Sequence, residues 1–291
     1  PYCGGDVCGG FEEDRHLPAN RSGSESKRPI KVLLTRPAGQ TDRLATVLKA
    51  DGFEPFCLPM LELSAVNEIA QVETVKSRIQ QLADCDLAIF ISSNAVNYTA
   101  AFISQSALRW PPQLRCLGIG AATNQAIIDQ AWRLAVSDSE QANDAVGKQT
   151  SEALLESPAL SEVEDKRITI FRGVGGREFL AEELRSRGAL VEYCESYARH
   201  YPKYDKATLL AALDLTDNKV NAIIFASGET LDNFYQHLQD HALTAKLMSV
   251  PVIVPSQRVQ TLASDYGFKN IITAKNASAE EFLQALKETF S

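Results

Sequence analysis

Four short polar motifs, each directly after an apolar stretch, are the residues of this sequence best suited to bind an anion. The free N–H groups and the dipole at the start of a helix attract negative charge, and Ser or Gly allows close approach. Each motif alone is also explained as a simple helix N-cap, but four of them together favour a polyanionic ligand. The candidate binding residues are Ser92, Ser93, Asn94, Gly120, Thr123, Ser227, Gly228, Ser256 and Arg258.

Two arginines extend this set. Arg36 and Arg172 follow similar apolar runs and lie 136 residues apart, and each is placed to clamp a carboxylate. A solvated loop arginine remains the alternative for each of them. Thr35, which precedes Arg36, completes the candidate binding residues.

Motifs for metal, nucleotide and serine-nucleophile chemistry are absent. The sequence lacks G-x-G-x-x-G, G-x-x-x-x-G-K-[ST] and G-x-S-x-G. His237 and His241 have a helical spacing but no H-E-x-x-H glutamate, so we expect a solvated helix face and not a metal site. Cys57, Cys85, Cys116 and Cys194 lie in or beside apolar stretches, where buried, reduced thiols are expected. No metal and no organic cofactor is predicted.

Composition narrows the class of protein. The 291 residues are 45% hydrophobic, which is typical of a globular protein, and their length suggests two domains. The net charge of −8 and the lack of a basic cluster argue against nucleic-acid binding. No apolar run is long enough to cross a membrane, and no signal-peptide pattern is seen, so a cytoplasmic location is expected. The polar, Gly/Ser-rich residues 1–29 are predicted to be a disordered leader.

The elements that must position the motifs alternate along the chain. Strand-like apolar runs lie at 31–35, 86–92, 115–120, 167–171, 221–227, 250–254 and 270–273, with amphipathic stretches such as 41–52, 177–188 and 278–290 between them. Short, wholly apolar strands alternating with helices are typical of parallel α/β sheets covered on both faces.

The sequence also repeats itself. Residues 32–52 match residues 168–188 at an offset of 136, and 86–96 and 117–123 match 221–231 and 252–258 at an offset of 135. One offset holding through three ordered motifs indicates two copies of one α/β unit, at roughly 30–165 and 166–291.

Two segments are too long to be single ordinary strands. Residues 53–66 and 189–201 exceed the usual strand length, and we expect them to cross from one sheet to the other. The predicted fold is therefore α/β, with two nested flavodoxin-like parallel-sheet domains from an internal duplication, joined by a two-strand linker. Residues 30–60 and 202–291 would form the outer domain and residues 64–195 the inner one.

The motifs, taken in order, resemble those of the uroporphyrinogen-III synthase family. The resemblance rests on KVLLTRPAGQ and the LPMLEL segment, on FISSNAVNYTAAF (90–102), LGIGAATNQAI (117–127), FASGETLDNF (225–234) and ESYAR (195–199). It covers residues 30–291. The second copy of the "GxxT" turn departs from the family pattern, because Pro255 and Arg258 stand where relatives carry glycine and threonine.

The resemblance implies a function. Members of this family close the linear tetrapyrrole hydroxymethylbilane to uroporphyrinogen III, invert ring D and release water, without a cofactor. The implied partners are that polycarboxylate substrate and the upstream enzyme that forms it, and the expected state is a monomer. A cleft lined with helix N-termini would suit the eight substrate carboxylates.

Tyr197 is the candidate catalytic residue. It matches the tyrosine of the family's "vYrr" segment and lies on a crossing segment, while its repeat equivalent is Leu61. A hydroxyl present in one copy alone indicates a task that the duplicated fold does not need. A phenol is protonated at neutral pH and can donate to a departing hydroxyl. A buried structural tyrosine is the alternative.

Two other classes of function remain open. A two-domain module could close on an anion without catalysis, although the missing signal peptide counts against a periplasmic-type receptor. A tandem pair of flavodoxin-like regulatory domains would need an acidic phosphoacceptor at a strand end, where this sequence has Ser, Gly and Thr.

Overall fold

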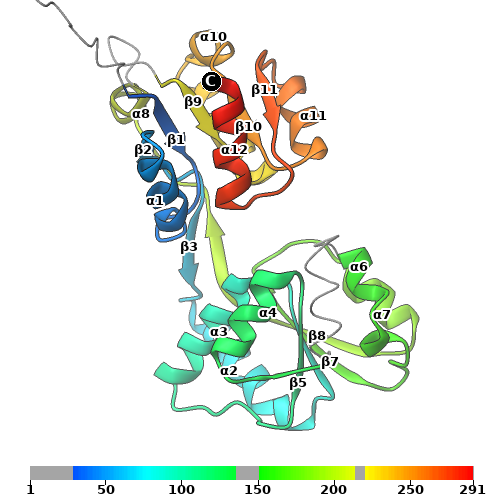
Figure 1. Ribbon diagram of the computed structural model, residues 1–291. Coiled ribbons are helices and arrows are strands. Elements are labelled where there is room, and N and C mark those ends of the chain that lie inside the picture. Colours follow the sequence, from blue (N-terminus) through cyan, green and yellow to red (C-terminus); the bar gives the residue numbers. More distant parts are fainter. Residues whose placement is uncertain (1–28, 136–150, 214–219, 291) are drawn as a thin grey trace, which may run out of the picture.

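The computed structural model describes residues 29–135, 151–213 and 220–290, so the expectation for the leader lies almost wholly outside the described residues. Its strands form two separate sheets connected by a pair of long segments (Figure 1). The chain is thus a mixed α/β protein with parallel sheets, which confirms that part of the predicted fold class.

The five-stranded sheet has the order β2-β1-β9-β10-β11, and all its neighbouring pairs are parallel. Its strands come from both ends of the chain and are β1 (Lys31–Leu34), β2 (Glu54–Cys57), β9 (Ala222–Ile224), β10 (Val252–Val254) and β11 (Ile271–Thr273). Helices α1 (Asp42–Ala50) and α12 (Ala279–Phe290) pack on one face. Helices α8 (Lys206–Leu213), α9 (Gly228–Asp240), α10 (Thr244–Leu247) and α11 (Gln257–Asp265) contribute to the core on the other face.

The six-stranded sheet has the order β3-β8-β7-β4-β5-β6 and comes from the middle of the chain. Its strands are β3 (Glu62–Ala65), β4 (Leu87–Phe90), β5 (Arg115–Gly118), β6 (Arg133–Leu134), β7 (Arg167–Gly173) and β8 (Leu190–His200). One core lies under α2 (Ile69–Gln80), η1 (Gln81–Asp84), α3 (Ser93–Gln105) and α4 (Ala121–Asp129). The opposite core lies under α6 (Ser151–Leu155), η2 (Pro158–Leu160) and α7 (Phe179–Ser186).

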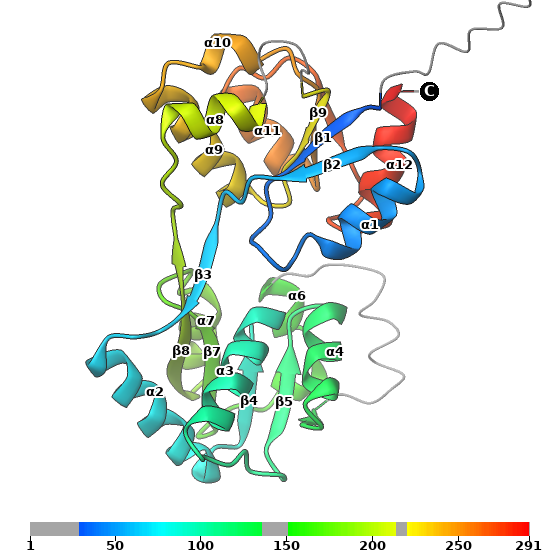
Figure 2. The same cartoon turned by 90° about the vertical axis from the view of Figure 1, so that its left-hand side faces the viewer.

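The two long segments behave differently from each other. Residues 189–201 contain one continuous strand, β8, whereas residues 53–66 divide into β2 in one sheet and β3 in the other. Pro59 lies in the break and has no N–H to donate to a ladder, while Leu58 and Met60 on either side still donate to carbonyls of residues 34 and 35. Beyond the break, β3 pairs antiparallel with the end of β8, and the two strands run between the sheets (Figure 2).

Two expectations about individual side chains were wrong. His237 is 2% exposed and its Nε2 lies 2.9 Å from the carbonyl oxygen of Pro202, so this face of α9 is packed and not solvated. The segment before α8 lies against it, with the ring centroids of Tyr201 and Tyr204 4.5 and 5.4 Å from that of His237. Cys57, the last residue of β2 at the sheet edge, is exposed, whereas Cys116 and Cys194 are buried as expected.

Burial of His237 predicts a pH-dependent stability. Desolvation lowers the pKa of His237 and the charge of His241 lowers it further, against the opposing effects of the Pro202 carbonyl and Asp240. Because the unfolded chain then binds a proton more readily than the folded one, stability falls as the pH drops below about 6.5. Urea unfolding at pH 7.5 and 5.5 should show a smaller drop for His237→Gln than for the parent. An equal drop in both proteins would contradict this.

The described residues contain neither a helix suited to cross a membrane nor a cluster of metal ligands. None of their helices is long and apolar enough to cross a membrane. No group of three or more His, Cys, Asp or Glu side chains in the same part of the chain is arranged to hold a metal ion.

Candidate active site

Tyr197 lies where β8 leaves the six-stranded sheet and begins its pairing with β3. Its side chain is 4% exposed, and its hydroxyl is 3.2 Å from Oγ of Ser92. The ring stacks on Tyr98, with centroids 5.2 Å apart, and also packs closely against Gly173. A Cβ at position 173 would lie 2.8 Å from the Tyr197 ring, so only glycine leaves room for it.

A β-bulge sets this orientation. The pairing of β7 with β8 shifts between Arg172 and Gly173, so that Arg172 faces Glu195 but Gly173 faces Tyr197. The extra residue, Ser196, reverses the alternation of β8, and Ser196 and Tyr197 are consecutive buried residues. The Ser196 hydroxyl accepts a hydrogen bond from Thr99 of α3. The bulge therefore turns Tyr197 toward the start of α3.

The motif at 92–94 forms the start of α3. Ser92 is the N-cap, and its hydroxyl accepts a hydrogen bond from the backbone N–H of Ala95 at 3.2 Å. Ser93 is the first helical residue. Asn94 accepts a hydrogen bond of 2.9 Å from Gln40, which precedes α1. This contact brings the start of α3 next to a loop of the five-stranded sheet.

The other three motifs are also helix starts. Gly120 is the N-cap of α4 at a φ of +80°, and Thr123 in its first turn is buried. Ser227 caps α9 in a reciprocal arrangement with Thr230, and Gly228 is the first helical residue. Ser256 caps α11 in an extended conformation without a side-chain hydrogen bond, and Arg258 lies in that helix's first turn.

Thr35 and Arg36 contact residues of the five-stranded sheet and of the segments packed on it. The Thr35 hydroxyl is fully buried and donates to the carbonyl oxygen of Ile224 at 2.8 Å. The Arg36 guanidinium donates to the carbonyl oxygen of Ala277 and lies over the ring of Phe282, 5.6 Å from its centroid. Burial lowers the pKa of Arg36. The structure thus positions Arg36 against α12.

Arg172 is held by two carboxylates of the chain itself. It is 7% exposed and forms 2.9 Å ion pairs with Glu178 and Glu195, while its guanidinium lies over the ring of Tyr193. Burial lowers the pKa of Arg172, but the hydrogen bonds to the two glutamates outweigh it and raise the pKa overall. Hydrogen bonds from Tyr193 and Arg172 lower the pKa of Glu178. Arg172 therefore anchors a charged network.

Arg172 and Arg258 nevertheless line one cavity of about 420 Å³. Arg258 comes from α11 beside the five-stranded sheet, whereas the remaining lining residues belong to the six-stranded sheet or to the helices and turns next to it. Two further arginines face the same cavity, Arg177 and Arg199, together with one acidic residue, Glu152. A cavity with four arginines suits a ligand that carries several carboxylates.

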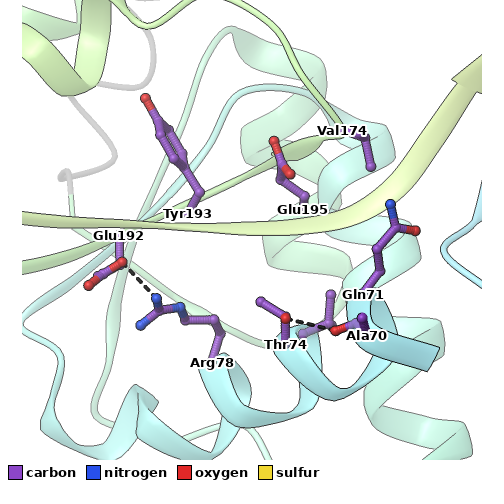
Figure 3. Close-up of a pocket in the computed structure, with 9 residues that line it drawn as sticks. Ala70, Gln71, Thr74, Arg78, Val174, Glu192, Tyr193 and Glu195 are labelled. Carbon is purple, nitrogen blue, oxygen red and sulfur yellow. Dashed lines mark hydrogen bonds and ion pairs between the residues drawn. The ribbon is translucent and has the colours of Figure 1, made fainter. Parts of the chain in front are cut away.

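A second cavity, of about 390 Å³, lies between α2 and β8 (Figure 3). Arg78 of α2 forms a 2.8 Å ion pair there with Glu192 of β8, and Glu195 borders it as well. Acidic side chains outnumber basic ones along its lining, so it is less suited to a polyanion than the arginine-lined cavity.

Sequence reasoning did not select three residues that the structure brings to this region. Arg177 lies in the turn after β7 and Arg199 at the end of β8, and both line the arginine cavity. Gln40 reaches Asn94 across 54 residues of sequence. Arg199 lies within ESYAR and Gln40 within KVLLTRPAGQ, two of the segments that resemble the family, so both had a usable signal, but nothing in the sequence marked Arg177.

Comparison with known proteins decides the family. The family model described as uroporphyrinogen-III synthase HemD matches residues 42–284. This chain belongs to the uroporphyrinogen-III synthase family. The resemblance noted in the sequence is thereby confirmed.

Two relatives in the uroporphyrinogen-III synthase family match over their full length. The chain is 31% identical to the uroporphyrinogen-III synthase of Salmonella typhimurium and 28% identical to that of Escherichia coli, each over 89% of this chain and 100% of the relative. A crystal structure of a mutant uroporphyrinogen III synthase from Thermus thermophilus has a TM-score of 0.57 at 17% identity, covering 89% of this chain and 99% of that one. The last comparison shows a shared fold.

Proposed function

We propose that the chain closes hydroxymethylbilane to uroporphyrinogen III, with inversion of ring D and loss of water. It is an enzyme of porphyrin biosynthesis of the cyclising lyase kind, as its family membership and its full-length relatives indicate. The observation that carries the substrate class is the cavity of about 420 Å³ lined by Arg172, Arg177, Arg199 and Arg258.

In this proposal Tyr197 is the general acid. Its hydroxyl would donate a proton to the hydroxyl group that leaves the terminal ring, the step in which water forms. The Ser92 hydroxyl, 3.2 Å away, would hold the phenol in place, and stacking on Tyr98 fixes the plane of the ring. The backbone N–H groups at the starts of α3, α4, α9 and α11 would bind substrate carboxylates.

We further propose that two nested domains arose by internal duplication and are joined by β3 and β8. The five-stranded order β2-β1-β9-β10-β11 corresponds strand for strand to β8-β7-β4-β5-β6 of the other sheet. The first is the flavodoxin-like order, and the second is a circular permutation of it, as expected if the two copies exchange their first two strands. Equivalent glycines adopt equivalent conformations, with φ of +78° at Gly39 and +72° at Gly175. The proposed boundaries remain 30–60 with 202–291, and 64–195. A cytoplasmic monomer that receives substrate from the upstream enzyme completes the proposal.

If backbone N–H groups bind the substrate carboxylates, serine substitutions at the helix starts should change turnover only slightly. Ser227→Ala and Ser256→Ala, at positions without a contact to Tyr197, leave the N–H donors in place, so turnover should fall by less than about tenfold in each. Ser227→Ala should also cost about 0.5–2 kcal/mol of stability, because it removes a cap, whereas Ser256→Ala should cost none. Kinetics and urea unfolding check both. Losses above about a hundredfold in every variant would mean that side chains dominate.

The rate of hydroxymethylbilane consumption distinguishes a catalyst from a protein that only binds the anion. With preformed hydroxymethylbilane, the protein should speed substrate consumption in proportion to its concentration, and added EDTA should leave that rate unchanged. A binding module without catalysis would not speed consumption, and that result would contradict the proposal.

A further inference from the structure

Two consecutive residues at the start of α9 each meet an arginine of the cavity. Oε2 of Glu229 lies 3.5 Å from Nη1 of Arg199, which comes from the end of β8. A Cβ on Gly228 would lie 3.4 Å from Nη1 of Arg258, so the absence of a side chain there leaves room for this guanidinium. The start of α9 therefore has a guanidinium against each of its first two residues, one from each side of the cavity.

These arginines differ from Arg172 in how firmly they are held. Arg172 is almost fully buried between two glutamates at 2.9 Å, whereas the Arg199–Glu229 contact is 3.5 Å long and joins side chains that are 34% and 43% exposed. Arg199 can thus change partners at little cost, while Arg172 cannot, because that would leave buried charge unpaired.

We infer that Glu229 is a built-in competitor, which holds Arg199 until a carboxylate of the substrate replaces it, with Arg258 as the neighbouring cation of the same subsite. This inference rests on the proposed function, since it requires a polycarboxylate ligand. The exchange keeps Arg199 paired in both states, so it is never left without a partner. The exchange costs free energy because the displaced Glu229 carboxylate stays close to the incoming substrate carboxylate, and the two negative charges repel each other.

The exchange predicts that removing an acidic residue improves binding. Glu229→Gln keeps the size of the side chain but gives up the competing charge, so the affinity for uroporphyrin III should rise by about 3- to 10-fold. Uroporphyrin III is the oxidised, fluorescent form of the product and carries the same eight carboxylates. Arg199→Gln and Arg258→Gln should each weaken binding by about 10-fold or more. Fluorescence titration at fixed ionic strength measures all three.

Matched controls are available on the same elements. Asp240→Asn makes the same change of charge at the far end of α9, and Arg78→Gln removes an arginine from the cavity shown in Figure 3. Both should leave the affinity unchanged. If Arg78→Gln weakened uroporphyrin III binding and Arg258→Gln did not, the ligand would bind in the other cavity and the inference would be overturned. Thermal unfolding of each variant confirms that the changes in affinity come from folded protein.

The double variant distinguishes exchange from simple repulsion. If Glu229 competes for Arg199, then Glu229→Gln should gain less than about 2-fold in an Arg199→Gln background. An equal gain in both backgrounds, or no gain in the parent, would overturn the inference. Formation of isomer III by the parent protein is measured separately. A parent that binds uroporphyrin III but does not form isomer III contradicts the proposed function alone.

Discussion

Tyr197→Phe is expected to lower the turnover of hydroxymethylbilane by roughly 10²–10⁴, the usual contribution of a general acid. The substitution removes one oxygen from a side chain that is 4% exposed, and the ring keeps its stacking on Tyr98 and its contact with Gly173. The fold and the KM should therefore change little. Steady-state kinetics, with circular dichroism as a check of folding, measure this.

The neighbouring Tyr98 provides the matched control. Burial raises the pKa of Tyr98, and the adjacent Tyr197 raises it further, so Tyr98 is a protonated phenol at neutral pH. Of these two tyrosines, however, only Tyr197 has its hydroxyl within hydrogen-bond distance of the Ser92 hydroxyl. Tyr98→Phe should retain turnover within about threefold. Near-normal turnover of folded Tyr197→Phe would show that the phenol is not the acid.

Among residues without a functional side chain, Gly173 is the one whose substitution, Gly173→Ala, is expected to lower turnover most. Its Cβ would lie 2.8 Å from two ring carbons of Tyr197, closer than packed atoms can approach, so the ring must move away from Ser92. Overpacking of this kind costs about 1–3 kcal/mol of stability. Displacement of the phenol should lower turnover by a factor approaching that of Tyr197→Phe. Urea unfolding and kinetics give the two quantities.

A double variant checks that Gly173 acts through Tyr197. In a Tyr197→Phe background the hydroxyl is already gone, so Gly173→Ala should reduce turnover by no more than about threefold further. Stability should still fall, because the ring still meets the new methyl group. A full, additive loss of turnover in that background would contradict a positioning role for Gly173.

The elements were largely predictable because their signals are local. Each expected strand overlaps an observed one, and Gly52 and Gly188 follow α1 and α7 with φ of +84° and +88°, the left-handed conformation that favours glycine after a helix end. The cap positions of the four motifs were predictable for the same reason, since Ser or Gly before an apolar helical pattern is a short-range signal.

Partners distant in sequence were not predictable in this way. Whether Arg172 faces solvent, substrate or protein depends partly on Glu195, which reaches Arg172 only through the pairing of β7 with β8. It depends also on how the turn before α7 places Glu178, six residues further along the chain. The burial of His237 depends on the path of residues 201–204, which no periodicity encodes. The bulge at Ser196 likewise follows from pairing and not from the sequence of β8 alone.

The repeat was also only partly readable. The sequence match pairs Gly120 with Pro255, yet the helix caps are Gly120 and Ser256, which lie 136 residues apart. The two caps differ in conformation, with φ of +80° at Gly120 and −166° at Ser256. Pro255, which the sequence match pairs with Gly120, cannot take the left-handed conformation of that glycine. The turn before α11 therefore has a different backbone conformation from the turn before α4.

The most direct test of the proposed function is the isomer composition of the product. Preformed hydroxymethylbilane should be incubated anaerobically with the purified protein, oxidised to porphyrin, and resolved into isomers I and III. Hydroxymethylbilane closes without assistance to uroporphyrinogen I, so the buffer control reports the uninverted background. The proposal predicts that isomer III predominates and that its fraction rises with protein concentration. Isomer I alone, at every protein concentration, would contradict it.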